Sequence, residues 1–418
     1  MLRRLLRSPA TWLFVAFLVI YGLTAGFSLS RHSLAPHFVY LAESFLHGHL
    51  DLIHVPDPPY DLTLFERRWY VSFPPLPALL MLPPVALRGL AVSDVAFSVV
   101  MGALNVSLFY AVLARFGLWA RARGARASRA PTEGIWLCAL LGLGTPLWYC
   151  AALGSVWYTA HVVAVTCLCL YALEALGRSR PILAGLWLGL GFLARAPVLL
   201  AFPFTLALGL QKARNYREGT RFLLLLALGM APALLGQAAY NWARFGDPLE
   251  FGYRWMNSPG PLLERQATWG QFSLHFLPEN LYTLLIRPPL VSLAPLRVEP
   301  DPWGMGLLIT CPALLLVLSP VEGLALPILE TRLRPEAQPE GFFGKNLVSC
   351  LGLWLSIALV QLPSLLYFNT GSYQFGYRFA LDWLPLGILL VALGTGGRLR
   401  WWGKALIVVS VLMHLWGV

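Results

Sequence analysis

The side chains that could carry out acid–base chemistry are concentrated in residues 30–93, a polar segment between two long apolar runs. Residues 36–49 within it have helical periodicity. One face of that predicted helix carries five polar residues: His37, Tyr40, Glu43, Ser44 and His47. Asp51 and Asp61 follow in a loop rich in acidic and aromatic residues. Because carboxylates and imidazoles can accept a proton from a hydroxyl group, we expect the chemistry of this chain in such a segment.

A short part of the same segment contains several groups that can bind metals. Five histidine or acidic residues lie within residues 47–57: His47, His49, Asp51, His54 and Asp57. Their spacing matches no specific metal-binding template, although they could hold a divalent metal. A solvated polar loop explains the same composition, so we assign no metal ligand and no definite cofactor.

A second polar segment, residues 241–302, combines aromatic and charged side chains. They are Asp247, Glu250, Tyr253, Arg254, Trp255, Glu264, Arg265, Trp269, His275 and Glu279. This composition suits a pocket for a sugar or a glycan acceptor. It suits equally an interfacial helix that tryptophan residues anchor at the membrane surface.

The rest of the chain consists mainly of apolar runs of membrane-spanning length. The 418 residues are 57% hydrophobic and only 12% charged, and the mean hydropathy is +0.64. These runs predict an all-α polytopic membrane protein that forms a single transmembrane domain over residues 1–418, with about eleven transmembrane helices. We expect these helices at residues 10–29, 94–114, 133–151, 160–176, 181–194, 197–210, 221–240, 303–319, 344–366, 380–396 and 403–417.

The distribution of charge predicts the topology. The net charge is +11, but Lys and Arg are concentrated in short loops between apolar runs, as the positive-inside rule describes for the cytoplasmic side. This pattern argues against a nucleic-acid partner and places residues 30–93 and 241–302 on the external face of a plasma (inner) membrane, bacterial by its short basic loops. The proline-rich run 74–92 is disfavoured as a lipid-exposed span. With residues 36–49 it predicts two juxtamembrane helices in the first external loop.

Five segments resemble one superfamily in their order and spacing. They are residues 37–51, 70–75, 191–197, 240–248 and 376–385, which include Tyr-Val-Ser-Phe-Pro-Pro and Gly-Phe-Leu-Ala-Arg-Ala-Pro. Together with one preceding helix and the following string of helices, they resemble the GT-C superfamily of polyprenyl-phosphate-sugar-dependent glycosyltransferases. The nearest branch is the protein mannosyltransferase and aminoarabinose transferase type. The resemblance covers nearly the whole chain and implies an integral-membrane hexosyl- or pentosyltransferase.

The resemblance also implies a mechanism and a set of site residues. A polyprenyl-phosphate-linked sugar enters from the outer leaflet, and an external carboxylate removes a proton from a hydroxyl of a glycan, lipid or protein acceptor. Arg195 and Arg378, at the external ends of two predicted helices, are expected to bind the departing lipid phosphate, since arginine at membrane depth is costly unless it is paired or functional. Tyr40, Tyr70 and Tyr377 are expected to contact the substrate.

The expected catalytic acid is missing from its usual position. The start of the first external helix reads Ala-Pro-His at residues 35–37, where the family usually carries Asp or Asp-Glu. Four residues remain candidates for the base: Glu43, Asp61, His37 and Asp51. We rank Glu43 and Asp61 above His37, whose ordinary pKa near 6.5 also suits proton transfer. Asp382 lies one helical turn after Arg378 and is expected to pair with it.

Two other functions are compatible with this sequence. A transporter or flippase of a lipid-linked substrate should carry ionisable residues near the bilayer midplane, and the predicted helices have few there. A catalytically inactive GT-C scaffold that binds lipid phosphate would explain the missing acid. In each case membrane lipids surround the protein.

Overall fold

The computed structural model describes residues 8–121, 131–178, 180–318, 342–396 and 398–418, and most of them are helical. The main helices are α2 (Pro9–Ala25), α3 (His37–Leu46), α4 (Leu76–Arg88), α5 (Asp94–Arg121), α6 (Pro131–Leu143), α7 (Leu147–Leu153), α8 (Val156–Leu176), α9 (Pro181–Phe192), α10 (Phe202–Leu210), α11 (Tyr216–Phe245), α12 (Gly260–Trp269), α13 (Leu277–Leu285), α16 (Phe342–Leu366), α17 (Leu384–Gly394) and α18 (Trp401–Gly417). Two antiparallel hairpins pair β1 (Thr63–Phe65) with β2 (Arg68–Tyr70) and β3 (Leu290–Leu293) with β4 (Leu296–Glu299).

Five helices in the described part of the chain are long and apolar enough to cross a membrane. They cover Pro9–Ser30, Asp94–Leu118, Val156–Leu176, Tyr216–Phe245 and Val348–Leu366, and a sixth span results if Thr132–Leu143 and Leu147–Leu153 act together across their 55° bend. Large apolar side chains on the outside of these helices are exposed, for example Leu23 at 78% and Leu224 at 65%. A multi-pass membrane protein accounts for both features, because lipid would cover these side chains.

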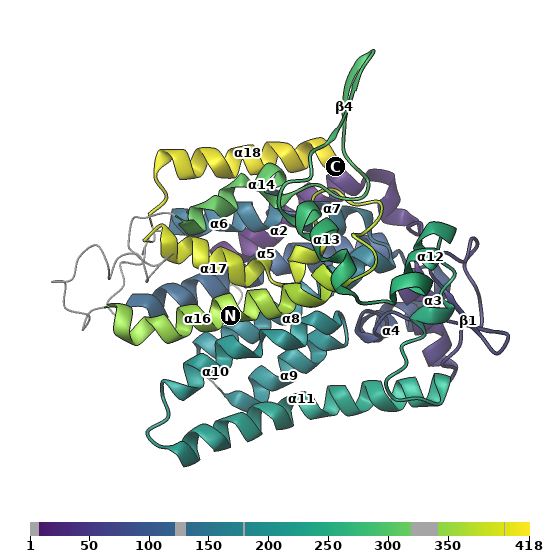
Figure 1. Ribbon diagram of the computed structural model, residues 1–418, viewed down its shortest axis with the longest axis horizontal. Helices are drawn as coiled ribbons and strands as arrows, with labels where there is room; N and C mark the ends of the chain where they lie inside the picture. Colours follow the sequence, from purple (N-terminus) through teal and green to yellow (C-terminus); the bar gives the residue numbers. More distant parts are fainter. Residues whose placement is uncertain (1–7, 122–130, 179, 319–341, 397) are drawn as a thin grey trace.

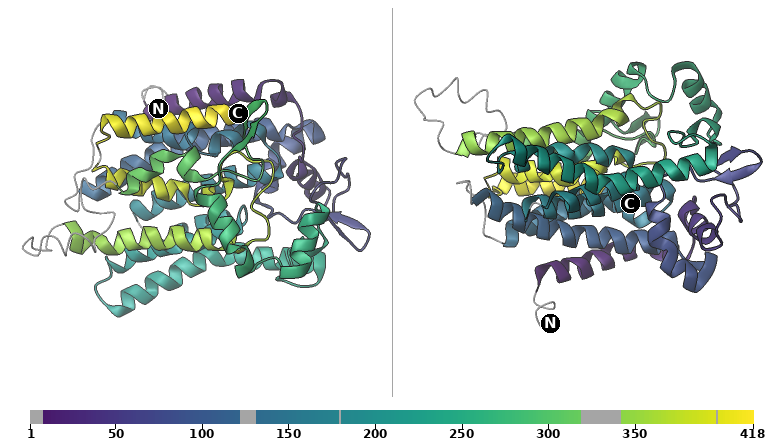
Figure 2. Two further views of the ribbon diagram at one scale, coloured as in Figure 1. Left: turned by 45° about the horizontal axis from the view of Figure 1, so that its top comes forward. Right: turned by 90° about the horizontal axis from the view of Figure 1, so that it is seen from below.

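The helices lie side by side along one direction, with α3, α4, β1 and α12 together at one end (Figures 1 and 2). Close packing inside the bundle depends on glycine where α9 meets α11. A Cβ atom at Gly185 would lie 2.1 Å from the Leu226 carbonyl oxygen, and one at Gly229 would lie 2.1 Å from the Ile182 carbonyl oxygen. Only glycine allows the two backbones to approach this closely.

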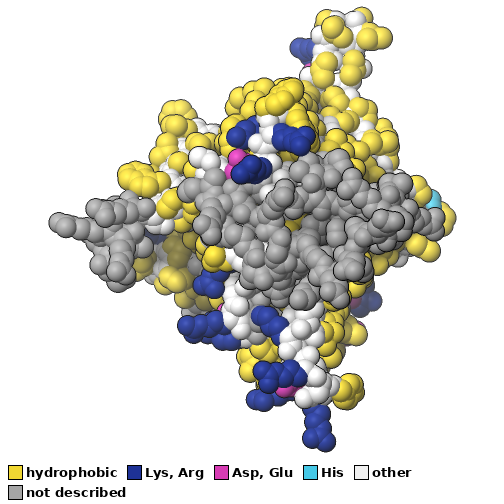
Figure 3. All heavy atoms as spheres, turned by 90° about the vertical axis from the view of Figure 1, so that its left-hand side faces the viewer, with side chains coloured by type: hydrophobic (Ala, Val, Ile, Leu, Met, Phe, Trp, Pro, Cys, Tyr) yellow, Lys and Arg dark blue, Asp and Glu magenta, His cyan; other side chains and the backbone are white. Residues whose placement is uncertain are grey.

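The end of the bundle opposite to α3 and α12 is rich in basic side chains. Figure 3 views the molecule from this end and shows several groups of Lys and Arg side chains on it. Helix α11 begins there with the exposed residues Arg217 and Arg221. The separation of a basic end from the end with α3 and α12 agrees with the charge pattern of the sequence.

The structure confirms the two helices predicted between the first two long spans but not the predicted count of eleven spans. Helix α3 lies within the predicted range 36–49, and α4 with the short helix η2 (Gly89–Ala91) lies within 74–92. The prediction of one continuous helix at 303–319 is wrong. This run contains α14 (Leu307–Thr310) and the 3₁₀ helix η6 (Pro312–Leu318) instead, because Pro312 interrupts the α-helical hydrogen bonds. The last residue of the predicted range lies outside the described residues.

Candidate functional site

Arg195 is presented at the break between α9 and α10. The backbone N–H of Arg195 donates to the Gly191 carbonyl (2.8 Å), and Pro197 in the following 3₁₀ helix η3 (Ala196–Ala201) prevents the α-helix from continuing. Arg195 itself is extended, with φ −147° and ψ 112°. Its side chain is 18% exposed.

A buried carboxylate holds this guanidinium in place. Asp382, at the end of the 3₁₀ helix η8 (Arg378–Asp382), is 1% exposed, and its Oδ2 accepts from Nε and Nη2 of Arg195 at 3.2 Å each. The other carboxylate oxygen lies 2.8 Å from Nδ1 of His161 on α8. Asp382 thus pairs with Arg195 and His161, and not with Arg378 as the spacing predicted. Three distant parts of the chain meet in this contact.

Arg378 lies beside the same site but is held by neutral groups. Its backbone N–H donates to Oε1 of Gln374 (3.0 Å), and Nη1 donates to the Ser372 carbonyl (2.8 Å). Within the described part of the chain, Nε has no hydrogen-bond partner and the guanidinium forms no ion pair. The Phe379 ring lies near both guanidiniums, 5.3 Å from Arg195 and 5.1 Å from Arg378.

Asp61 is a second acidic residue near this site, close enough to Arg378 for the charge of the arginine to act on its carboxyl group. Its Oδ2 accepts from Nε1 of Trp157 (2.8 Å), and its Oδ1 accepts from the Ser258 hydroxyl (3.2 Å). Burial raises the pKa of Asp61 above its ordinary value, although these two hydrogen bonds and the charge of Arg378 act in the opposite direction. The carboxyl group is therefore a stronger base than an exposed aspartate.

The backbone around Asp61 joins the two polar segments of the sequence. The Asp61 N–H donates to the Asn257 carbonyl (3.1 Å), and the Asn257 N–H donates to the Leu62 carbonyl (2.7 Å). Asp61 has a φ of 52°, in the left-handed region that most side chains avoid.

Two tyrosines complete what we call the central site: Asp61, Arg195, Tyr253, Tyr367 and Arg378. Burial raises the pKa of Tyr253, and the charges of Arg195 and Asp61 both act on its phenol group. The phenol of Tyr367 interacts with Tyr253, Asp61, Arg195 and Arg378. Neither phenol hydroxyl makes a hydrogen bond to a residue that the structure describes. Both hydroxyls are therefore free to bind a ligand between the carboxyl group and the arginines.

The other candidate bases lie in different surroundings. A carboxylate oxygen of Glu43 lies 2.9 Å from Nδ1 of the exposed His54. Asp51 lies 3.4 Å from Nδ1 of His49 and 4.0 Å from Nη1 of Arg68. These contacts are near the surface of the loop.

His37 supports the loop that carries Asp61. It is fully buried, and its Nε2 lies 2.6 Å from the carbonyl oxygen of Tyr60, the residue before Asp61. Burial lowers the pKa of His37 to about 4. A neutral imidazole that donates to this carbonyl positions Asp61, and its low pKa makes it a weak base at neutral pH.

The three predicted substrate tyrosines take separate positions. Tyr40 packs edge-on against His32, with ring centroids 5.8 Å apart, and Tyr70 packs against Phe245 at 5.4 Å. Tyr377 is fully buried, and its hydroxyl lies 3.4 Å from Nε2 of Gln361. None of them belongs to the central site as defined above, although Tyr377 lies directly before Arg378.

The described residues contain no group of three or more His, Cys, Asp and Glu side chains that could hold a metal ion. Within residues 47–57, the structure places His49 beside Asp51 and His54 beside Glu43, so the potential ligands are divided between two small pairs. These residues do not fit a divalent metal, and we derive no chemical step through one.

No sequence pattern identified Trp157, His161 or Tyr367 as candidate site residues. Each is one residue in or beside an apolar helix, where aromatic and histidine residues are common as packing or interface groups. No local pattern distinguishes them. Only their contacts with Asp61, Asp382 and the arginines reveal their place in the site.

No protein-family model matches the chain, and no curated protein matches it. Solved structures resemble it in overall arrangement. An oligosaccharyltransferase of Archaeoglobus fulgidus in the apo form is 14% identical, with a TM-score of 0.47 over 97% of this chain and 56% of that chain. ArnT from Cupriavidus metallidurans bound to undecaprenyl phosphate is 13% identical, with a TM-score of 0.42 over 95% and 62% of the two chains.

A third structure is the archaeal oligosaccharyltransferase AglB from Archaeoglobus fulgidus in complex with an inhibitory peptide and a dolichol-phosphate. It is 13% identical, with a TM-score of 0.41 over 91% of this chain and 50% of that chain. The chain thus spans between half and two thirds of the length of these proteins. The residues of the central site are therefore defined here by the geometry of this chain alone.

Proposed function

We propose that this protein is an integral-membrane glycosyltransferase that moves a sugar from a polyprenyl-phosphate donor to an acceptor hydroxyl on the external face. One observation carries the proposal: the carboxyl group of Asp61, whose pKa is raised by burial, lies within range of the charge of Arg378, and the charges of Asp61 and Arg195 both act on Tyr253 and Tyr367. A base beside two phosphate-binding cations suits a reaction in which a hydroxyl loses a proton and a phosphate leaves.

The charges of the central site favour an anionic ligand. Asp382 neutralises Arg195, whereas Arg378 has no ion-pair partner among the described residues. The charge of Arg378 acts on Asp61, but no carboxylate forms an ion pair with its guanidinium in the described part of the chain. A phosphate would supply charged hydrogen-bond acceptors in direct contact with it. The planar guanidinium forks of the two arginines match the oxygen geometry of a phosphate.

In the proposed reaction, the acceptor O–H proton moves to the Asp61 carboxylate. The acceptor oxygen forms a bond to the anomeric carbon of the donor sugar as the bond from that carbon to the phosphate oxygen breaks. The electron pair of that bond stays on the phosphate, and Arg195 and Arg378 stabilise the resulting charge. The free hydroxyls of Tyr253 and Tyr367 would bind the sugar hydroxyls and orient the ring.

The test is the release or transfer of sugar by the full-length protein in nanodiscs, with a panel of radiolabelled polyprenyl-phosphate sugars. We compare the wild type with Arg195→Lys, which keeps the charge beside Asp382 but loses the planar fork. Arg254→Lys is the matched control, because Arg254 pairs with Glu250 and is 63% exposed. We expect turnover of at least one donor, its loss in the Arg195 variant, and wild-type turnover in the control.

Two results would contradict the proposal. If the Arg195 variant binds and turns over every donor as the wild type does, the central site does not bind the phosphate. If wild-type protein binds a donor through Arg195 but never transfers its sugar to water or to any added lipid, glycan or peptide, the chain acts as a lipid-phosphate-binding scaffold.

A further inference from the structure

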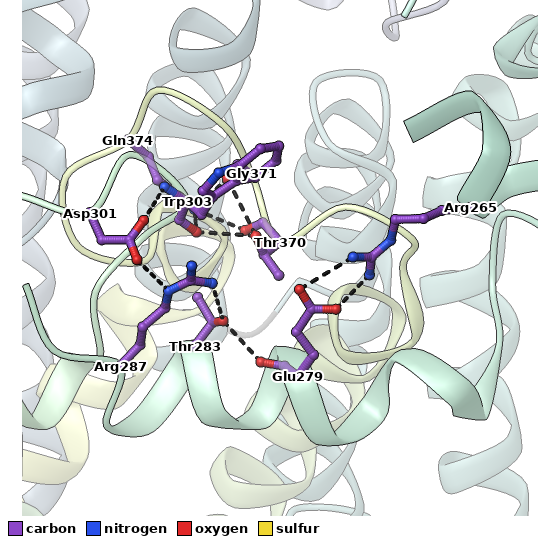
Figure 4. Close-up of polar contacts among 9 residues, drawn as sticks. All are labelled: Arg265, Glu279, Thr283, Arg287, Asp301, Trp303, Thr370, Gly371 and Gln374. Carbon is purple, nitrogen blue, oxygen red and sulfur yellow. Dashed lines mark hydrogen bonds and ion pairs between the residues drawn. The ribbon is translucent and has the colours of Figure 1, made fainter. Parts of the chain in front are cut away.

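A separate pocket of about 210 Å³ lies next to the central site. We call it the Trp303 pocket. It is lined by Pro261, Leu262, Arg265, Glu279, Arg287, Trp303, Phe368, Asn369 and Thr370. They come from α12, from α13 and Arg287 just after it, and from Trp303 and residues 368–370, which lie outside helices and strands (Figure 4). The volume is below the roughly 300–1,000 Å³ of pockets that take drug-sized ligands, so it suits one small ring.

The charges of the Trp303 pocket cancel one another. Arg265 donates to both carboxylate oxygens of Glu279, at 3.3 and 2.6 Å. Nε of Arg287 donates to Oδ2 of Asp301 at 2.7 Å. Figure 4 shows the two ion pairs on either side of the space in front of Thr370. An anionic ligand would leave a net negative charge here, whereas a neutral polar ligand would not.

Neutral hydrogen-bonding groups and an aromatic ring remain available in the pocket. Within the described part of the chain, neither the side-chain N–H₂ of Asn369 nor the indole N–H of Trp303 has a hydrogen-bond acceptor. The Trp303 side chain is 40% exposed. Sugars combine hydroxyl groups, which bind such donors and carboxylate acceptors, with an apolar ring face that packs on an aromatic side chain.

The pocket lies directly behind one wall of the central site. Tyr367 belongs to the central site, and the next residue, Phe368, lines the pocket. Asn280 on α13 holds this segment by donating from Nδ2 to the Tyr367 carbonyl at 2.8 Å. In addition, Gln374 donates to the Trp303 carbonyl at 3.0 Å and accepts from the backbone N–H of Arg378. A ligand in the pocket is therefore one loop away from the proposed reaction.

We infer that the Trp303 pocket binds a neutral sugar residue of a glycan acceptor. This inference rests on the proposed function, because only then does a second sugar lie near the central site. The two sites divide the chemistry: the central site takes the phosphate, and the pocket takes an uncharged ring.

The test is saturation-transfer difference NMR on the full-length protein in nanodiscs, with methyl hexosides as neutral ligands and glucuronate and inorganic phosphate as anionic ones. The key variant is Trp303→Ala. Its backbone carries the structural contacts, since the N–H donates to Asp301 and the carbonyl accepts from Thr370 and Gln374, so removal of the exposed ring should not unfold the protein. Trp303→Phe keeps an aromatic ring. Trp269→Ala is the control, because Trp269 at the end of α12 is 50% exposed, stacks on His275 and does not line the pocket.

We expect at least one neutral hexoside to bind, and Trp303→Ala to weaken its binding by about tenfold. Trp303→Phe and Trp269→Ala should retain it. Hexoside binding should also persist in Asp61→Asn, because Asp61 does not line the pocket. If the protein transfers no sugar but still binds hexosides, the transferase proposal fails and the pocket assignment stands. Absence of hexoside binding, equal binding by Trp303→Ala, or tighter binding of glucuronate or phosphate than of hexosides would overturn the inference.

Discussion

The Trp303 pocket and the central site each contain two arginines, and the two sites differ in how the charges of these arginines are balanced. In the Trp303 pocket, Arg265 and Arg287 each have a carboxylate partner, Glu279 and Asp301. In the central site, Arg195 shares Asp382 with His161, and Arg378 has only backbone and neutral partners among the described residues.

The difference shows that the residue type does not decide what an arginine binds. Where each of two neighbouring guanidiniums has its own carboxylate, as in the Trp303 pocket, the group as a whole presents little net charge to a ligand. A buried guanidinium with no counter-charge attracts an anion. The comparison therefore separates the proposed phosphate site from the proposed neutral site, although both contain two arginines and at least one aromatic residue.

The largest effect should come from Asp61→Asn, which removes the base and keeps the shape of the side chain. We expect turnover to fall by about 10² to 10⁴, the range for loss of a general base, while donor binding persists because both arginines remain. Turnover and donor binding are measured on the same nanodisc sample. Glu43→Gln is the control and should change turnover less than about threefold, since Glu43 pairs with exposed His54. Loss of turnover in the Glu43 variant instead would identify Glu43 as the base.

The pH dependence of turnover should reveal the pKa of the Asp61 carboxyl group. Burial raises the pKa of Asp61, so the active carboxylate forms at a higher pH than the ordinary value near 3.9. Turnover should rise by about tenfold per pH unit below this pKa and then level off. A profile whose acid limb lies at or below the ordinary aspartate value would exclude Asp61 as the base. Sugar binding in the Trp303 pocket should show no such limb over this range.

Replacing one arginine in each site tests the comparison directly. Arg378→Gln should weaken donor binding by roughly 10- to 100-fold, because it removes a charge-assisted hydrogen bond to the phosphate. Arg287→Gln should leave donor binding within about twofold, since its charge is already balanced by Asp301. Thermal unfolding of both variants checks that they fold. Equal losses in the two variants would mean that the phosphate contacts both sites or neither.

The smallest effect on activity at neutral pH should come from His37→Gln, and its signature is stability in acid. Burial lowers the pKa of His37 to about 4, so the unfolded chain binds the proton more readily. The contribution of His37 to the free energy of unfolding should be fully present above about pH 6.5. It should decrease by about 3 kcal/mol as the pH falls toward 4. Thermal unfolding in detergent between pH 4 and 7 measures the loss, which should shrink in the variant. An unchanged dependence would assign the acid sensitivity to other groups.

The sequence was informative where local physical rules decide the structure. Helical periodicity in residues 36–49 and the proline content of residues 74–92 led to predicted helices in the ranges where α3 and α4 lie. It failed at 303–319, where an apolar run forms short, irregular turns. A Cβ atom at Gly306 would lie 2.3 Å from the Ile286 backbone nitrogen, a packing constraint that no local pattern reveals.

For the site, the sequence identified Arg195 and Arg378 because arginine beside an apolar run needs a partner or a function. It could not choose among Glu43, Asp61, His37 and Asp51, since all four lie in one polar segment. The structure distinguishes their surroundings. Trp157 and Ser258 bind the Asp61 carboxyl group from 96 and 197 residues away along the chain.

By itself, then, the sequence determined that this is a helical membrane protein whose polar chemistry lies in two segments, because hydrophobic length and charge are local properties. Only the tertiary structure decided that these segments meet at Asp61, that Asp382 belongs to Arg195, and that a neutral pocket lies behind Tyr367. Those facts depend on burial and on the balance of charge among groups far apart in the chain, which arise only when the helices pack together.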